Sequence, residues 1–105
     1  MQAVNLTSQQ FQELARESKA VLVDYWAQWC GYCRRIAPAY ERIAEQYGDQ
    51  IVVAKVNIDE EPELANAERI EVIPTLVLYK EGKAVDSLVA PESQAAISEF
   101  IQRNL

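Results

Sequence analysis

The sequence has 105 residues, of which 50% are hydrophobic and 25% are charged, with three glycines and four prolines. This length and balance fit one ordered globular domain spanning residues 1–105 and exclude a largely disordered chain. The formal net charge of −6 repels phosphate backbones and anionic lipids, so binding to nucleic acid or to a membrane surface is not expected.

The N-terminal segment and the cysteine count give the expected location. Residues 1–14 contain no basic start, no long apolar core and no small-residue cleavage site, and no apolar run approaches about 18 residues. We therefore expect a cytoplasmic protein without a membrane span. Two cysteines are too few for a disulfide framework, and a cytosolic thiol pair is more often catalytic or metal-binding than structural.

Apolar periodicity in the first part of the chain predicts strand, helix and strand. A weak strand near residues 3–6 precedes a helix that Thr7 and Gln10 open in capping-box spacing and that ends near residues 18–19. The run over 20–27, AVLVDYWA, is apolar apart from one acid. This pattern is typical of a central strand that is covered on both faces.

The middle of the chain continues the alternation. A helix is predicted over 33–47, with Pro38 inside it as an expected kink and Gly48 as its stop. A strand over 51–58 and a short helix over 62–69 follow.

The last part of the chain predicts a hairpin and a helix. The turn signal Glu81-Gly82 separates strands over 75–80 and 83–89, and an amphipathic helix begins near Ser93. Strands alternating with helices before a hairpin predict an α/β fold with a mixed sheet that carries helices on both faces.

Both cysteines lie in the segment WAQWCGYCRR, where the central strand ends and the next helix begins. At a helix N-terminus, the free N–H groups and the dipole favour a thiolate on Cys30, and Arg34 and Arg35 add positive potential. Cys33 lies three residues further on and is expected to be the more buried sulfur. The spacing therefore predicts a mixed disulfide on Cys30 that Cys33 resolves.

The aromatic and glycine neighbours of the pair are candidate binding residues. Gly31 leaves room for the backbone of a partner, and Tyr32 is the residue best placed to change the redox poise. Of Trp26 and Trp29, we expect one in the core and the other lining the site.

Redox chemistry is favoured over a metal site and over a structural link. With no histidine and one CxxC pair, a single chain lacks the four donors of a typical zinc site, although two chains could share a metal. A structural disulfide here would close a loop too short to stabilise the fold much. We therefore expect a monomer with no bound metal or cofactor.

Three further positions are candidates with open alternatives. Asp24, the one acid in the apolar run, could accept the proton of Cys33, or it could be a strand-edge carboxylate that points to water. Lys55 could be its partner, or a solvated lysine. The residues alone do not predict a cis Ile73–Pro74 bond, because only about 5% of X–Pro bonds are cis.

The chain resembles the thioredoxin family over nearly its full length. The matching segments run from VLVDYWAQWCGYC through IAP, VAKVNIDEEPELA and IPTLVLYKEGK to SEFIQRNL. The resemblance implies the thioredoxin fold: five strands in the spatial order first, third, second, fourth and fifth, flanked by four helices. It also implies a protein dithiol–disulfide oxidoreductase that acts on disulfide-containing proteins and receives electrons from a thioredoxin reductase.

The resemblance also implies roles for individual residues. Cys30 corresponds to the nucleophile and Cys33 to the resolving thiol. Asp24 corresponds to the buried acid and Lys55 to its neighbour. A cis Ile73–Pro74 bond is implied, beside which a substrate chain lies extended.

Three departures from the family pattern affect partner recognition. Tyr32 stands where the motif has proline, Ala90 lies in VAP where the family usually has valine-glycine-alanine, and the segment 69–72 lacks glycines and adds Glu71. We expect a less reducing poise than that of a CGPC protein and slow reduction by a generic reductase.

The alternatives to a protein-disulfide reductase are a thiol oxidase or isomerase, a thioredoxin-fold binding module, and a dimer that shares a metal cluster.

Overall fold

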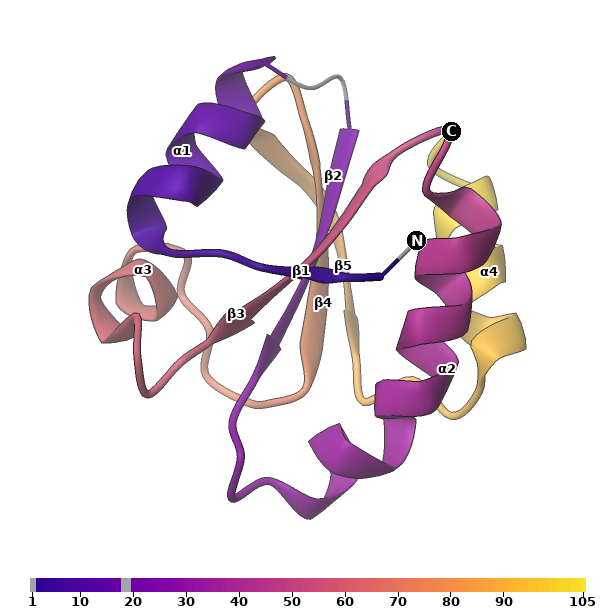
Figure 1. Ribbon diagram of the computed structural model, residues 1–105, viewed down its shortest axis with the longest axis horizontal. Helices are drawn as coiled ribbons and strands as arrows, with labels where there is room; N and C mark the ends of the chain where they lie inside the picture. Colours follow the sequence, from indigo (N-terminus) through magenta and orange to yellow (C-terminus); the bar gives the residue numbers. More distant parts are fainter. Residues whose placement is uncertain (1, 18–19) are drawn as a thin grey trace.

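The computed structural model describes residues 2–17 and 20–105, so the predicted end of the first helix at Ser18 and Lys19 lies outside the described residues. None of the helices in these ranges is both long enough and apolar enough to cross a membrane. The elements follow the predicted order (Figure 1): β1 (Val4–Asn5), α1 (Ser8–Glu17), β2 (Ala20–Trp26), α2 (Gly31–Tyr47), β3 (Val52–Asn57), α3 (Pro62–Ala67), β4 (Thr75–Lys80), β5 (Lys83–Val89) and α4 (Gln94–Gln102).

The five strands form one mixed sheet in the order β1-β3-β2-β4-β5, which is the order that the family resemblance implies. β3 pairs in parallel with β1 and β2, whereas β4 pairs antiparallel with β2 and β5. At the centre of the sheet, Asp24 on β2 lies between Lys55 on β3 and Leu76 on β4.

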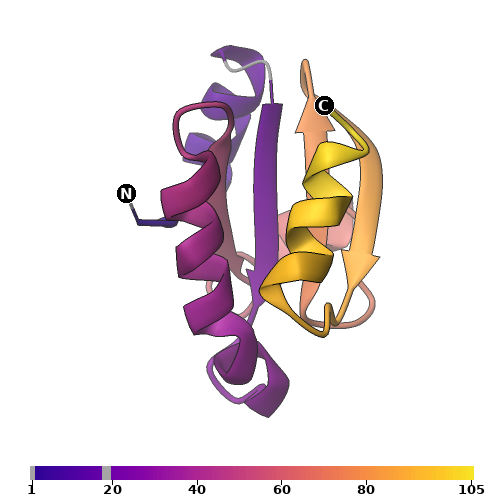
Figure 2. The ribbon, with the colours of Figure 1, turned by 90° about the vertical axis from the view of Figure 1, so that its right-hand side faces the viewer.

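Helices cover both faces of this sheet. α2 and α4 pack on one face, and α1 and α3 lie on the other (Figures 1 and 2). Side chains of β2 alternate between the two resulting cores: Leu22 contacts the α2 and α4 side, while Val21 and Val23 contact the α1 and α3 side. Burial on both faces explains why β2 is a continuous apolar run, since each fully buried Val or Leu contributes about 1.5–3 kcal/mol.

The helix that carries the cysteines begins at Gly31, two residues earlier than predicted. Cys30 is its N-cap, with an extended backbone, and its sulfur accepts the Cys33 N–H. Pro38 lies inside α2, and the first turns of the helix are inclined to the rest, as a proline kink requires (Figure 1). Gly48 ends the helix with a φ of −59°, in the right-handed region and not in the left-handed one.

The predicted local signals are confirmed at the other element ends. The Thr7 and Gln10 side chains each accept the backbone N–H of the other residue before α1. In the β4–β5 turn, Glu81 and Gly82 have φ values of 51° and 82°, as a two-residue hairpin turn requires. Ser93 caps α4 by accepting the N–H of Ala96.

Four segments, from three distant parts of the sequence, meet at one end of the sheet. These are the end of β2, the start of α2, the segment before β4 and the loop after β5 (Figure 1). In an α/β sheet this is the end at which sites are built.

Candidate active site

Cys30 and Cys33 form a disulfide at the start of α2, and their Cα atoms lie 5.2 Å apart. Cys30 is 8% exposed and Cys33 is 3% exposed. The relative burial therefore follows the prediction, with the first sulfur nearer to solvent and the second further into the fold.

Backbone geometry places the Cys30 sulfur at the positive end of α2. Its Sγ lies 3.2 Å from the Cys33 N–H that donates to it. Arg34 donates from Nη1 to the carbonyl of Gln28 at 2.5 Å, which keeps one guanidinium beside the loop that leads into Cys30. The N–H groups, the dipole and this nearby charge all favour a thiolate on Cys30 once the disulfide is reduced.

The segment before β4 forms the wall opposite Cys30. The Ile73–Pro74 bond is cis, as the family resemblance implies. The carbonyl oxygen of Ile73 lies 3.9 Å from the Cys30 Sγ. Ala90, in the loop after β5, donates its N–H to the Pro74 carbonyl at 2.9 Å, so this loop is joined to the same wall.

Trp29 and Gly31 lie on the open side of the disulfide. Trp29 is 65% exposed, and its Nε1 donates to Asp59 Oδ2 at 2.8 Å, a partner that the sequence analysis missed. A Cβ added at Gly31 would meet no atom within 4 Å, so the expected space for a partner is present. Trp29 is therefore the tryptophan that lines the site, whereas Trp26 is only half-buried and packs against the cysteines, so neither is fully buried in the core as one was expected to be.

Asp24 is buried, at 2% exposure, and its Oδ1 has no hydrogen-bond partner among the described residues. The alternative of a strand-edge carboxylate that points to water is therefore wrong, because β2 is central and covered on both faces. Burial raises the pKa of Asp24 to about 7, the charge of Lys55 opposes this shift, and the charge of Glu41 adds to it. A carboxyl with a pKa near neutrality can accept and release a proton at physiological pH.

Lys55 contacts a different acid from the one the sequence suggested. Its Nζ forms an ion pair with Glu41 Oε2 at 3.3 Å, and it lies 5.7 Å from the centre of the Trp26 ring. Asp24 and Lys55 are neighbours across β2 and β3, but Glu41 of α2 takes the direct contact. No motif marks Glu41 in the sequence, because its role depends on how α2 crosses the sheet.

Glu41→Gln should lower the pKa of Asp24 below about 7. The change removes one negative charge near Asp24 and releases Lys55 from its ion pair, and both effects favour the ionised carboxylate. NMR titration of the Asp24 carboxyl carbon in the oxidised protein measures the shift. Glu45→Gln, at an exposed position of the same helix, is the control, and an equal pKa in wild type and Glu41→Gln would contradict the prediction.

Tyr32 occupies the second position between the cysteines and makes a contact that the sequence did not suggest. Its hydroxyl donates to the carbonyl of Pro91 at 2.9 Å. Its ring packs against the cysteine cluster and against the core between α2 and α4, and the Arg35 guanidinium lies 6.0 Å from the ring centre.

Ala90→Gly should stabilise the protein by about 1 kcal/mol. Ala90 has a φ of +46°, a left-handed conformation in which a Cβ costs about 1–2 kcal/mol. The free energy of unfolding in urea measures the gain. Ala84→Gly, on β5 outside the left-handed positions, should instead lose about 0.5–1 kcal/mol, and a loss of stability in Ala90→Gly would contradict the argument.

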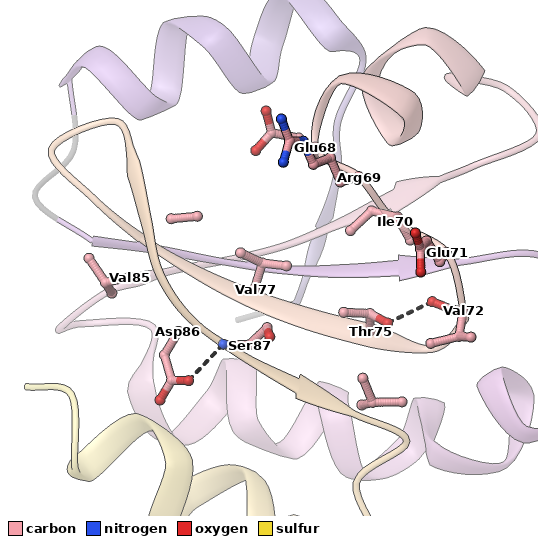
Figure 3. Close-up of a pocket in the computed structure, with 12 residues that line it drawn as sticks. Glu68, Arg69, Ile70, Glu71, Val72, Thr75, Val77, Val85, Asp86 and Ser87 are labelled. Atoms are coloured by element: carbon pink, nitrogen blue, oxygen red, sulfur yellow. Dashed lines mark hydrogen bonds between the residues drawn. The ribbon is translucent and has the colours of Figure 1, made fainter.

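A groove of about 500 Å³ lies beside the site and contains neither cysteine. It runs between the segment after α3 and the β4–β5 hairpin, with Glu71 and Val72 on one side and Val85 and Ser87 on the other (Figure 3). Thr75, which lines the groove, donates its hydroxyl to the Val72 carbonyl at 2.6 Å. The lining of the groove therefore flanks the cis-proline, with Glu71 and Val72 before it and Thr75 after it.

No cluster of three or more cysteine, aspartate or glutamate side chains within residues 2–17 and 20–105 is arranged to hold a metal ion. The expectation that the protein needs no metal or cofactor stays a prediction.

Comparisons with known proteins agree with this geometry. The Thioredoxin family model matches residues 2–103. The chain is 44% identical over 94 residues to thioredoxin 1 of Synechococcus elongatus, covering 90% of this chain and 88% of that protein. It is 43% identical over 103 residues to the thioredoxin of Alicyclobacillus acidocaldarius, covering 94% and 98% respectively.

Solved structures are similar over the same extent. A Plasmodium falciparum thioredoxin has a TM-score of 0.89 at 34% identity, covering 98% of this chain and 100% of that chain. A mutant thioredoxin from Halobacterium salinarum has a TM-score of 0.88 at 30% identity, covering 97% and 89%.

Proposed function

The chain belongs to the thioredoxin family, and we propose that it reduces protein disulfides by attack of Cys30 and resolution by Cys33. It is a protein dithiol–disulfide oxidoreductase with a CxxC pair at disulfide distance. The observation that carries the assignment of roles is that Cys30 is the N-cap of α2, with the Cys33 N–H directed at its sulfur.

In the first proposed step, the Cys30 thiolate attacks one sulfur of the substrate disulfide. A bond forms between the Cys30 Sγ and that sulfur, the substrate S–S bond breaks, and the other substrate sulfur leaves as a thiolate that takes up a proton. The N–H groups and the dipole at the helix N-terminus favour the thiolate form of Cys30 that this step requires.

In the second proposed step, Cys33 attacks Cys30 and releases the substrate. Asp24 accepts the Cys33 proton, the Cys30–Cys33 bond forms, the bond between Cys30 and the substrate breaks, and the second substrate sulfur leaves as a thiolate. The substrate gains two electrons and the protein loses two. The raised pKa of Asp24, about 7, suits this role because its carboxylate can take a proton and later return it to solvent.

The residues around the disulfide supply the proposed substrate groove. Ile73 and Pro74 form one wall, Ala90 borders the same wall, and Trp29 and Gly31 leave the sulfur accessible. An extended substrate chain laid beside Pro74 would bring its disulfide to Cys30. Lys55 acts on the reaction only through the charge that it places near Asp24.

We expect the reduced protein to cleave the disulfides of insulin and to have a less reducing potential than a CGPC protein. Proline restricts the start of the helix, and Tyr32 removes that restriction, so Tyr32→Pro should lower the potential; about 30 mV corresponds to 1.4 kcal/mol. Equilibration of wild type and variant with glutathione measures both potentials. A wild-type reduction potential at or below that of Tyr32→Pro would contradict the prediction that Tyr32 raises the potential. Failure of the reduced protein to cleave insulin would contradict the proposed reductase activity.

We further propose that a thioredoxin reductase reduces this protein in the cytoplasm and that the protein acts as a monomer. Tyr32 and Ala90 alter the surface that such an enzyme would contact, so a generic reductase should act slowly on wild type and faster on the Tyr32→Pro, Ala90→Gly double variant. The rates of reduction by the reductase are compared at equal concentrations of the two proteins. Equal rates would show that Tyr32 and Ala90 do not limit recognition by the reductase.

A further inference from the structure

The Tyr32 hydroxyl joins the active-site helix to the loop after β5. It donates to the Pro91 carbonyl at 2.9 Å, across 59 positions of the sequence. The Tyr32 ring itself is held by packing against the cysteine cluster and the α2–α4 core. The hydrogen bond therefore connects a fixed ring to a loop that borders the substrate groove.

The same loop also forms a hydrogen bond with the cis-proline wall. The Ala90 N–H donates to the Pro74 carbonyl at 2.9 Å, while Pro91 has no N–H to offer. The loop thus makes two hydrogen bonds: the Ala90 N–H donates to Pro74, and the Pro91 carbonyl accepts from Tyr32. Ala90 keeps its φ of +46° within this span, so the surrounding contacts hold a backbone conformation that alanine disfavours.

We propose that Tyr32 is a positioning residue that fixes the Ala90–Pro91 loop for the docking of protein substrates, a role that rests on the proposed function and extends it. The two departures from the family pattern, tyrosine at 32 and alanine-proline at 90–91, are then joined by the hydrogen bond from Tyr32 to Pro91. The hydroxyl offsets the strain at Ala90 and holds the loop at one distance from Pro74. A rigid loop favours extended protein chains that pair along the groove, while a small disulfide that reaches only the Cys30 sulfur does not need it.

Tyr32→Phe tests this role because it keeps the ring and removes only the hydroxyl. The ratio of kcat/KM for insulin to kcat/KM for a small aromatic disulfide should fall about three- to tenfold, the range for one lost hydrogen bond. The fall should come mainly from a higher KM for insulin. Tyr47→Phe is the matched control. The Tyr47 hydroxyl likewise connects α2 to another element, through Ser98 and Gln102 of α4, but it lies at the end of α2 far from the cysteines, so its ratio should not change.

Amide hydrogen exchange gives a second readout that does not depend on catalysis. In the oxidised protein, the Ala90 N–H should exchange about three- to tenfold faster in Tyr32→Phe than in wild type, while the β2 amides exchange at equal rates. In the Ala90→Gly background, the added effect of Tyr32→Phe on this exchange should be smaller, because glycine needs no support at positive φ.

The outcomes separate this proposal from the proposed function. An unchanged substrate ratio together with unchanged Ala90 exchange in Tyr32→Phe would overturn the positioning role while leaving Cys30 chemistry intact. A wild-type protein that reduces neither insulin nor the small disulfide would overturn the proposed function, and the exchange measurement would still decide whether Tyr32 holds the loop.

Discussion

Cys30→Ser should lower the rate of insulin reduction by about 10³-fold or more, whereas Cys33→Ser should accumulate a covalent complex with its substrate. A serine hydroxyl is not ionised at neutral pH, so the helix N-terminus has no nucleophilic anion to stabilise. Without Cys33, the mixed disulfide on Cys30 has no internal thiol to break it. Non-reducing electrophoresis and intact mass measure the complex, and turnover with excess dithiol measures the rate.

The double variant Cys30→Ser, Cys33→Ser is the control for the trapping experiment, since it should bind no substrate covalently. Capture through Cys33 in the Cys30→Ser variant, at the rate seen for Cys30 in the Cys33→Ser variant, would contradict the assignment. The burial difference between the sulfurs, 8% exposed against 3%, favours Cys30 as the site of capture.

Asp24→Asn should make the oxidised protein more stable at pH 8 by up to about 4 kcal/mol, and the gain should vanish near pH 4. The pKa of Asp24 is about 7 in the folded protein and near 3.8 when exposed, so the folded state binds the extra proton between these values. The free energy of unfolding therefore falls as pH rises from about 4 to about 7, and the full penalty of a buried charge remains above pH 7. Asparagine removes that penalty.

Urea unfolding at pH 4, 6 and 8, with the disulfide intact, measures this difference. Keeping the disulfide prevents thiol titration from adding to the pH dependence. Asp49→Asn, at an exposed position after α2, is the matched control and should follow the wild-type curve within about 0.5 kcal/mol. A stability gain in Asp24→Asn that is equal at pH 4 and pH 8 would show that ionisation of Asp24 is not the cause.

The same substitution should slow the release of the mixed disulfide by about 10²-fold at pH 7, as loss of a proton acceptor predicts. Stopped-flow measurement of the second step separates this effect from the first attack. The variant is thus expected to be more stable and less active. The buried carboxyl of Asp24 therefore lowers the stability of the folded protein but speeds the release of the mixed disulfide.

The fold was largely predictable because its signals are local. The apolar run of β2, the Thr7–Gln10 cap and the Glu81-Gly82 turn each specify structure within a few residues, and each is confirmed. The start of α2 was misplaced by two residues, because a cysteine is not among the usual N-cap residues and its capping depends on a sulfur acceptor.

The site was predictable only where one segment carries it. The positions of both cysteines follow from the strand-to-helix junction, whereas the apolar run left open whether Asp24 is buried or points to water. The contacts of Glu41 with Lys55 and of Tyr32 with Pro91 join residues 14 and 59 positions apart. Such pairs depend on how α2 lies against the sheet and against α4, which periodicity does not specify.

The central position of β2 also affects how the chain emerges from the ribosome. Its two neighbours are Val52–Asn57 and Thr75–Lys80, so one edge stays open until about 30 further residues have been made and the other until about 54 have been made. During that interval the nascent chain exposes one of its most apolar, β-prone segments, the condition under which unfinished polypeptides associate with one another. The hairpin that closes the second edge comes late in synthesis, and slow translation just before residue 75 should therefore lower the yield of native protein more than slow translation after residue 90.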